Sequence, residues 1–457
     1  MLPLTLAEVA AACGGRLAGG VPDRLVRGVA IDSRRVQPGD LFVGLRGERH
    51  DGDSFAAAAL AAGAAAVVVR EATAAALPAG AAAVVVDDGL AALQRLAAAV
   101  RRRLDVKVVG ITGSVGKTST KDILASLLRP LVPVAATAGN QNNEVGLPLT
   151  LLAADAGTRV VVAEMAMRGR GQIRELARLA APDVGVVTAV APVHLELVDT
   201  VEDVAAAKAE LLEELAGGTA VVPCDEPLLA PHLARFRGRV VTFGGPGADV
   251  AVVGSERRGE RTRLLVDAFG QRTTLDLNLT GAHYVRDALA ALAAFVALGF
   301  RPDQARAGAA AVALSGLRGE VRPLADGGLL LNDAYNANPV ATCAAVDHLV
   351  DLAAGRPAVA LLGDMHELGE GSDAYHRLVG EHCAAAGVAV VAVGALARAY
   401  LVGAPGERWF ASVDDCLAAL DEVVPPGAAV LVKASRAARL ERLAEALLAA
   451  RGEDGRA

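Results

Sequence analysis

A glycine-rich turn between an apolar run and a helical pattern constrains this chain more than any other feature. Residues 106–112 read VKVVGIT, which is typical of a buried strand, and residues 118–128 have a helical pattern. Glycines let the intervening backbone wrap an anion, and free N–H groups at the start of the helix favour phosphate. The pattern predicts a phosphate-binding loop formed by Thr112, Gly113, Ser114, Val115, Gly116, Lys117, Thr118 and Ser119.

This loop departs from the complete Walker pattern, because Ile111 stands where the first glycine of that pattern would fall. An ordinary strand-to-helix turn is the alternative interpretation. The strand before the turn and the helix after it favour phosphate binding. Lys117 can reach terminal phosphate oxygens, and the Thr118 hydroxyl group suits Mg²⁺.

Strand-like runs alternate with helical patterns over residues 105–316. The runs at 159–165 and 183–190 are apolar and rich in valine, as in strands buried on both faces. This alternation predicts a doubly wound parallel sheet. Residues 249–278 instead alternate apolar and polar positions around turn signals, which predicts antiparallel strands at the edge of the sheet. Residues 283–299 predict a helix that ends at a glycine.

The chain has 457 residues, which is too long for one ordinary core. We expect three α/β domains over residues 1–104, 105–316 and 317–457. The first contains β-like runs at 65–69 and 82–86, separated by alanine-rich helical stretches. In the third domain the strands are expected at 329–332, 358–362, 389–393 and 429–432, and the closing helix at 435–450.

Composition excludes several classes of protein. Hydrophobic residues make up 53% of the chain, but the most apolar run, residues 55–69, is too short for a membrane span. The first residues lack a basic leader, so we expect a cytoplasmic protein without membrane insertion. A net charge of −7 and only 3% aromatic residues argue against a nucleic-acid partner. Five scattered cysteines argue against a disulfide framework or a zinc site. We expect a monomer.

Three further residues have functional and ordinary interpretations. Glu164 closes an apolar run, where a carboxylate beside a phosphate loop could bind Mg²⁺ or could be a loop acid. His194 follows another strand-like run, and a lone histidine is more often structural. Lys208 lies in a helical pattern, where a lysine is usually solvated.

Read together, these residues belong to motifs that resemble the Mur ligases. The motifs appear in the family's order and cover nearly the whole chain: TGSVGKTSTK, Glu164–Met165, VHLE (193–196), AAAKAE (205–210), TGAHYVRDALAA (280–291), NDAYNANP (332–339), LGDMHELGE (362–370) and KASRAARLE (433–441). Residues 31–55 are similar to the family's uridine-nucleotide domain. Residues 139–152, YNANP and GDMHELGE are similar to the branch that adds D-alanyl-D-alanine.

The resemblance implies a fold and a reaction. An N-terminal domain would bind UDP-N-acetylmuramoyl-tripeptide, a central P-loop domain ATP and Mg²⁺, and a C-terminal Rossmann-like domain would close over the site. The reaction would be an ATP-dependent ligation of D-alanyl-D-alanine to the tripeptide carboxylate through an acyl phosphate. The composition breaks near residues 104 and 317 predict hinges for this closure.

The resemblance also implies roles for single residues. The catalytic group would be Lys117, His194 and Lys208, with Lys208 carbamylated. The metal group would be Thr118, Glu164, His194 and Lys208. The nucleotide would also contact Asp287, Arg318 and Asp333. The substrates would contact Ser33 and Arg34 in the uridine domain, Asn142 and Asn143 in the central domain, and Asn336 and Asn338 in the third domain.

Several positions depart from the family pattern. Ser119 replaces a common threonine, Ala189 and Ala191 replace asparagine and glycine, and Asp53 stands where histidine is frequent. Asp287 stands where an adenine-contacting asparagine is usual, and an ionised aspartate can only accept hydrogen bonds.

Two rival functions remain at this point. The chain could be another ligase of the superfamily, such as the tripeptide-forming Mur ligase or folylpolyglutamate synthase. The segment IDSRRVQPGDLF argues against the folate enzyme, and YNANP argues against the tripeptide-forming ligase. A P-loop NTPase that acts as a switch would hydrolyse nucleotide without forming a ligated product.

Overall fold

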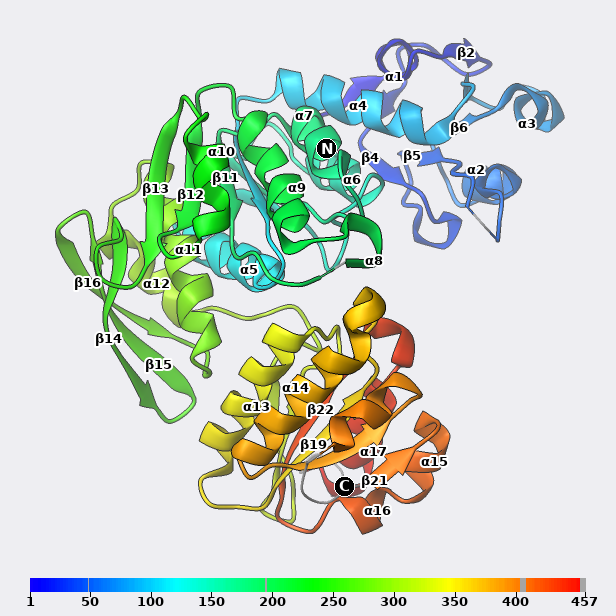
Figure 1. The fold of residues 1–457 in the computed structure, drawn as a ribbon. Coiled ribbons are helices and arrows are strands. Elements are labelled where there is room, and N and C mark those ends of the chain that lie inside the picture. Colours follow the sequence, from blue (N-terminus) through cyan, green and yellow to red (C-terminus); the bar gives the residue numbers. More distant parts are fainter. Residues whose placement is uncertain (48, 194, 403–407, 453–457) are drawn as a thin grey trace.

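The computed structural model describes residues 1–47, 49–193, 195–402 and 408–452. Three α/β units follow one another along the chain, each around its own main sheet (Figure 1). These sheets contain five, nine and six strands. The expected three-unit α/β architecture is confirmed, whereas the domain boundaries after residues 104 and 316 stay a prediction.

The N-terminal unit has a five-stranded sheet in the order β2-β7-β6-β5-β4, and the strands from β7 to β4 run parallel. A short antiparallel pair, β1 with β3, lies beside helix α1. The elements are β1 (Leu4–Thr5), α1 (Leu6–Cys13), β2 (Arg16–Ala18), β3 (Leu25–Val26), β4 (Gly28–Ala30), β5 (Asp40–Val43), α2 (Ala56–Ala61), β6 (Ala66–Val69), α3 (Glu71–Ala76), β7 (Ala83–Val85) and α4 (Gly89–Arg103).

The central unit has nine strands in the order β16-β15-β14-β13-β12-β11-β8-β10-β9. The strands from β9 to β14 are parallel, and β14, β15 and β16 form the expected antiparallel edge. The elements are β8 (Lys107–Thr112), α5 (Lys117–Leu128), β9 (Val134–Ala136), α6 (Gly146–Leu152), β10 (Val160–Glu164), α7 (Gln172–Ala180), β11 (Val184–Val187), α8 (Leu195–Val198), α9 (Val201–Glu213), β12 (Thr219–Pro223), α10 (Ala230–Leu233), β13 (Arg239–Gly244), β14 (Val250–Arg258), β15 (Arg261–Ala268), β16 (Gln271–Leu277), α11 (His283–Ala297) and α12 (Arg306–Ala310).

The order of the central strands positions the site. Strand β8 lies between β10 and β11, and all three are parallel. Glu164 pairs with Ile111, and Val187 pairs with Thr112. The loops that follow these three strands therefore meet at one edge of the sheet, where ligands bind in open α/β folds.

The C-terminal unit has six strands in the order β17-β18-β22-β19-β20-β21, and β17 alone is antiparallel to its neighbour. The closing helix begins at Glu441 and not at Ser435, because a 3-10 turn and the left-handed Arg439 separate it from β22. The elements are β17 (Glu320–Pro323), β18 (Leu329–Asn332), α13 (Pro339–Ala353), β19 (Ala358–Gly363), α14 (Ser372–Ala385), β20 (Ala389–Val393), β21 (Arg408–Phe410), α15 (Val413–Ala418), α16 (Leu420–Val423), β22 (Ala429–Lys433) and α17 (Glu441–Arg451).

The apolar cores divide the chain differently from the sheets. One cluster of buried residues runs without interruption from α1 and α4 in the N-terminal unit to α6, α7 and β10 in the central unit. The C-terminal unit has two clusters of its own, one on each face of its sheet. The continuous core argues against a hinge near residue 104, whereas the separate cores favour one near residue 317.

Two contacts join the central unit to α13 beside the linker. The Thr280 hydroxyl group lies 2.9 Å from Nε2 of His348, a buried histidine. Arg257, on β14, donates a 2.6 Å hydrogen bond to the carbonyl of Asp351. These contacts hold the C-terminal unit on the side of the antiparallel edge.

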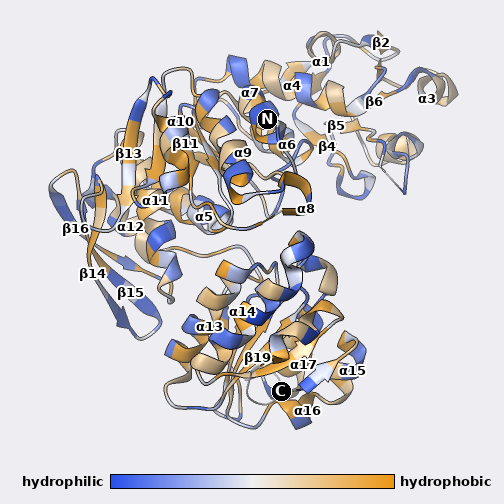
Figure 2. Cartoon of the chain, in the orientation of Figure 1, coloured by the Kyte–Doolittle hydropathy of each residue, from blue (hydrophilic) through white to orange (hydrophobic). Residues whose placement is uncertain are grey.

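The strands inside the sheets are more apolar than the antiparallel strands at the edge of the central sheet (Figure 2). Apolar residues concentrate in the parallel strands, whereas β14 and β15 have polar outer ends. Residues 253–258 of β14 are exposed. Within the described parts of the chain, no helix has the length and apolar character that a membrane span needs. Of the five cysteines, Cys13, Cys383 and Cys416 are buried, but Cys224 is exposed.

Candidate active site

The turn after β8 is held in a conformation that only glycine accommodates at two positions. Gly113 and Gly116 have φ angles of 148° and 81°. A Cβ atom on Gly113 would overlap the Thr188 hydroxyl group, and one on Gly116 would overlap the Asp287 carboxyl group. No described side chain caps the first turn of α5. Its backbone N–H groups are therefore available to an anion, and phosphate binding at this turn stays a prediction.

Lys117 lies at the start of α5 and turns back over the loop. Its Nζ atom donates hydrogen bonds of 2.7 Å to the carbonyl of Gly113 and 3.3 Å to that of Ser114. Burial lowers the pKa of Lys117, although the nearby Glu164 carboxylate acts in the opposite direction. An anion in the loop would give this ammonium group a stronger partner than two carbonyl groups.

Glu164 is buried at the carboxyl end of β10 and contacts both neighbouring loops. Its Oε2 atom accepts a 2.8 Å hydrogen bond from the Thr118 hydroxyl group, and Oε1 accepts one of 2.7 Å from Asn142. Its backbone N–H group donates to the Thr137 hydroxyl group at 2.9 Å. The structure thus brings together Thr118 and Glu164, which the sequence had grouped. Asn142, predicted to face the muramoyl substrate, contacts this carboxylate.

Lys208 is buried in the middle of α9, not solvated. It is 2% exposed, and none of the described residues accepts a hydrogen bond from its Nζ atom. Burial lowers the pKa of Lys208 well below its ordinary value, and the positive charge of Lys117 lowers it further. His194, the other residue predicted for catalysis and metal binding, lies outside the described residues.

Asp287 lies on α11 and covers the phosphate-binding turn. Its carboxyl group is buried against Gly116 and accepts a hydrogen bond from Ser119. Burial raises the pKa of Asp287 from 3.8 to about 7, although the bond from Ser119 and the charge of Arg286 oppose this shift. A neutral carboxyl group can donate a hydrogen bond, which an ionised one cannot.

A lysine and an aspartate of the C-terminal unit form an ion pair beside the same cavity. Lys433, at the end of β22, forms an ion pair with Asp333 and donates a 2.9 Å hydrogen bond to the carbonyl of Asn336. Asp333 also accepts a 3.1 Å hydrogen bond from the N–H group of Gly319. The guanidinium group of Arg318 lies 3.9 Å from the centre of the Tyr335 ring.

Two of the predicted substrate residues have structural contacts. The side chain of Asn338 caps α13 through a 2.9 Å bond from the N–H group of Ala341. Asn143 accepts a 3.0 Å bond from the N–H group of Gly146 at the start of α6. Asn336, in contrast, has an exposed side chain.

A cavity of about 1260 Å³ lies between the central and C-terminal units and collects most of these residues. Thr112, Gly113 and Lys208 are not part of its lining, and neither are Ser33 and Arg34 of the N-terminal unit. The predicted residues that line it are Ser114, Val115, Gly116, Lys117, Thr118, Ser119, Asn142, Asn143, Glu164, Asp287, Arg318, Asp333, Asn336 and Asn338.

Ser33 and Arg34 lie in a 3-10 turn after β4. The Arg34 guanidinium group pairs with Asp32 at 2.7 Å, and its side chain is 86% exposed. This pair holds the pKa of the Asp32 carboxyl group at about 2, mainly through the side-chain hydrogen bond. Arg34 is therefore accessible to solvent, with its charge paired to Asp32.

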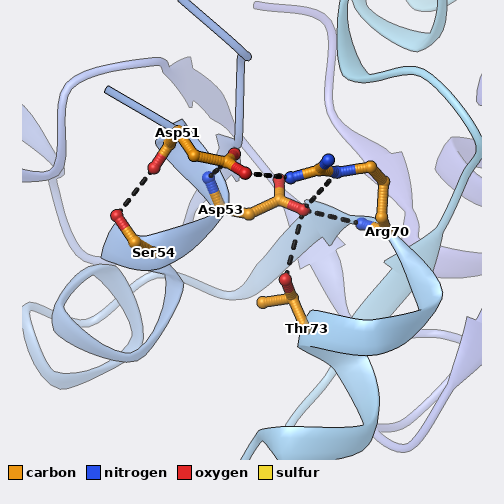
Figure 3. Close-up of polar contacts among 5 residues, drawn as sticks. All are labelled: Asp51, Asp53, Ser54, Arg70 and Thr73. Atoms are coloured by element: carbon orange, nitrogen blue, oxygen red, sulfur yellow. Dashed lines mark hydrogen bonds and ion pairs between the residues drawn. The ribbon is translucent and has the colours of Figure 1, made fainter. Parts of the chain in front are cut away.

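The buried carboxylate of Asp53, at the position of the departure, lies in a polar cluster of the N-terminal unit (Figure 3). One carboxylate oxygen of Asp53 accepts bonds from Nε and N of Arg70, at 2.9 and 3.1 Å, and from the Thr73 hydroxyl group at 3.2 Å. Arg70 also pairs with Asp51, whose carbonyl accepts from Ser54. The cluster fixes the loop after β5 against the start of α3.

Sequence reasoning missed several residues of the site. Lys433 follows the apolar run 429–432 directly, so a charged residue at the end of a buried strand was a usable signal. Thr188 similarly follows β11, and its hydroxyl group donates a 2.5 Å bond to the carbonyl of Val115.

Comparisons with known proteins agree with this architecture. Residues 25–101 match the Mur ligase family catalytic domain, residues 111–295 the Mur ligase middle domain, and residues 317–436 the Mur ligase glutamate ligase domain.

Whole-length relatives exist as well. The chain is 33% identical to the UDP-N-acetylmuramoyl-tripeptide--D-alanyl-D-alanine ligase of Bacillus subtilis, over 98% of this chain and 99% of that protein. The crystal structure of MurF from Acinetobacter baumannii superposes with a TM-score of 0.88 and 30% identity, covering 98% and 99% of the two chains. The crystal structure of MurF ligase from Thermotoga maritima in complex with ADP superposes with a TM-score of 0.81 and 30% identity, covering 92% of this chain and 97% of that one. The chain therefore belongs to the Mur ligase family.

Proposed function

We propose that this chain joins D-alanyl-D-alanine to the terminal carboxylate of UDP-N-acetylmuramoyl-tripeptide, in an ATP-dependent reaction that forms ADP. One observation carries the proposal: a phosphate-binding loop and a buried carboxylate face the basic and acidic residues of a second unit across one cavity. The relatives named for this activity match nearly their whole lengths. The expected ligase function thus agrees with both the site and the family.

The nucleotide side of the site suits ATP with Mg²⁺. The Thr118 hydroxyl group and the Glu164 carboxylate supply the oxygen ligands that Mg²⁺ prefers, and they lie beside the phosphate-binding turn. Bound there, Mg²⁺ would neutralise negative charge on the phosphate groups. Lys117 would supply the complementary positive charge from the protein.

Carbamylation of Lys208 fits its surroundings. A buried lysine without a described hydrogen-bond acceptor, beside another lysine, favours the uncharged amine. The uncharged amine can add to CO₂ with loss of a proton, which gives a carbamate anion. This anion would place a negative charge beside Lys117, where a positive charge is unfavourable.

In the first step, the substrate carboxylate attacks the γ-phosphate of ATP and gives an acyl phosphate and ADP. Two anions approach one another, so Lys117 lowers the barrier by offsetting phosphate charge. In the second step, the neutral amine of D-alanyl-D-alanine attacks the acyl carbon and releases phosphate. Arg318, Asp333 and Lys433 belong to the wall of the cavity that moves if the C-terminal unit closes, and closure would exclude water from the acyl phosphate.

The N-terminal unit would hold the uridine diphosphate part of the substrate, with Ser33 and the accessible cation of Arg34 at its surface. A cytoplasmic monomer is part of the proposal, since the reaction draws on ATP and one chain contains all the residues assigned to it.

Mass spectrometry tests the proposed reaction directly. The chain is incubated with ATP, Mg²⁺, D-alanyl-D-alanine and UDP-muramoyl tripeptides with diaminopimelate or lysine as the third residue. The expected product has the mass of the tripeptide plus the dipeptide minus water, and phosphate release depends on D-alanyl-D-alanine. Phosphate release without a ligated product would instead support a P-loop NTPase of the switch type.

A further inference from the structure

Lys121 is a buried charge one helical turn beyond the phosphate-binding loop, and the proposed reaction gives it no role. Its side chain is only 2% exposed. The Nζ atom pairs with Asp122 at 2.7 Å and donates a 3.0 Å hydrogen bond to the carbonyl of Thr137. It also lies 3.4 Å from the Ser315 hydroxyl group. A buried lysine is retained at a cost, so its partners indicate what it does.

The contact with Thr137 leads to the metal-binding region. Thr137 follows β9, is buried, and accepts the backbone N–H group of Glu164 on its hydroxyl oxygen at 2.9 Å. The Thr150 hydroxyl group also donates to this oxygen at 3.4 Å. Thr137 thus links the two residues: its carbonyl accepts a hydrogen bond from Lys121, and its hydroxyl oxygen accepts one from the backbone of Glu164. Two hydrogen bonds therefore separate the lysine from the strand end that carries the carboxylate.

The contacts with Asp122 and Ser315 lead to the linker between the central and C-terminal units. Ser315 lies between α12 and β17, and its N–H group donates a 2.8 Å hydrogen bond to Asp122 Oδ2. Asp122 thus accepts from Lys121 on one oxygen and from the linker backbone on the other. The first half of the linker is fixed to α5.

The second half of the linker contacts both units, and most of its hydrogen bonds are with the C-terminal unit. The carbonyl of Arg318 accepts a 3.3 Å hydrogen bond from the Tyr284 hydroxyl group on α11 of the central unit. The N–H group of Tyr335 donates to the carbonyl of Leu317 at 3.2 Å, and that of Gly319 donates to Asp333 at 3.1 Å. Gly316 stands between the two anchored halves, is exposed, and would meet nothing within 4 Å if it carried a Cβ atom. The backbone at Gly316 therefore has room to rotate, which makes it the candidate hinge of this linker.

We propose that Lys121 and Asp122 form a positioning pair that fixes the Glu164 carboxylate and the central-unit side of a hinge at Gly316, and so couples the nucleotide site to the orientation of the C-terminal unit. The inference rests on the proposed function for the role of Glu164. Lys121 acts through Thr137 and does not touch the nucleotide. The ammonium group of Lys121 has two branches of contacts, one through Thr137 to Glu164 and one through Asp122 and Ser315 to the linker. Because both branches share this group, a change in one is expected to shift the other.

Calorimetry tests the branch to Glu164. Binding of a non-hydrolysable ATP analogue is measured with Mg²⁺ and with EDTA for the full chain, Lys121→Met and Lys121→Arg. In the unaltered chain Mg²⁺ strengthens binding. In Lys121→Met, the increase in affinity caused by Mg²⁺ is expected to be about tenfold smaller, because the residue that positions a metal ligand has been removed. The affinity in EDTA is expected to stay within about twofold of that of the unaltered chain. Lys121→Arg, which keeps the charge, is expected to recover part of the loss.

Hydrogen–deuterium exchange tests the branch to the linker. In Lys121→Met and Asp122→Ala, residues 313–319 are expected to exchange faster than in the unaltered chain. Ser126→Ala is the matched control, because Ser126 lies on the same helix and its hydroxyl group donates a buried 2.8 Å bond to Gly308, away from the site. Its exchange at 313–319 and its Mg²⁺ effect should equal those of the unaltered chain.

The outcomes separate the two proposals. If the unaltered chain shows no Mg²⁺ effect on nucleotide binding, the assignment of Glu164 in the proposed function fails. If that effect is present and Lys121→Met keeps it in full, the positioning role fails. Should Lys121→Met not fold, Asp122→Ala decides, since unchanged exchange at 313–319 in that variant overturns the coupling.

Discussion

The carboxyl group of Asp287 lies so close to Gly116 that a methyl group at this glycine would overlap it. The two residues are far apart in the sequence, and their contact places a titratable group over the phosphate-binding turn. An aspartate at this position adds a proton equilibrium beside the turn, which the asparagine expected from the family resemblance would not have.

Asp287→Asn should therefore change how stability depends on pH. The pKa of Asp287 is raised by burial from 3.8 to about 7, so its contribution is fully present below pH 3.8 and is lost as the pH rises towards 7. The free energy of unfolding of Asp287→Asn, relative to that of the unaltered chain, should therefore rise by roughly 2 kcal/mol between pH 5 and pH 8. Urea-induced unfolding of both chains at the two pH values measures this difference. An equal difference at both values would contradict the raised pKa.

Lys117→Met should reduce turnover about 1000-fold, because it removes a preorganised charge from the phosphate loop. Binding of the UDP-linked substrate, measured by calorimetry, should change little. Lys107→Met is the control, since Lys107 lies at the opposite end of β8 from the turn and its side chain is 65% exposed. Normal turnover of Lys117→Met would refute the assigned role.

Lys208 should carry a carbamate when bicarbonate is present. ¹³C-labelled bicarbonate is expected to give a carbamate resonance in the unaltered chain and none in Lys208→Met. Lys208→Ala should lose activity, by about 10- to 100-fold, and regain part of it when a short carboxylate is added. Full activity of Lys208→Ala without any addition would argue against the carbamate.

Arg70→Met should destabilise the N-terminal unit by about 1–3 kcal/mol, because it leaves the buried Asp53 carboxylate without its charged partner. Arg16→Met is the matched control, since Arg16 pairs with Glu71 on the surface, where both side chains are more than half exposed. Its cost should stay below about 1 kcal/mol. Urea-induced unfolding measures both variants, and equal costs would show that burial of Asp53 adds nothing.

Solution scattering should report closure of the C-terminal unit alone. With an ATP analogue and both substrates present, the radius of gyration should decrease, because the separate apolar cores allow this unit to move on Gly316. Substitution of Gly316 by proline, which restricts the backbone, should reduce the change. Identical profiles with and without ligands would contradict closure.

Local patterns in the sequence were sufficient for most of the fold. Apolar runs such as 329–332 and 389–393 became strands with the predicted bounds, since a strand buried on both faces must be apolar throughout. Gly113 to Gly116 formed a turn between β8 and α5 within the predicted segment, because its glycines and the flanking elements are close in the chain. The closing helix was placed too early, because its start depends on the left-handed Arg439, which the helical pattern of residues 435–450 does not show.

The sequence by itself determined the order of the units, the glycine-rich turn after β8 and the types of residue available for chemistry. Only the tertiary structure decided which of them meet: Thr118 with Glu164, Lys433 with Asp333, and Lys121 with both Thr137 and Ser315. It also merged the cores of the first two units while leaving the third separate. The physical reason is that hydropathy and turn propensity act between near neighbours, whereas pairing of charges across loops depends on strand order and packing.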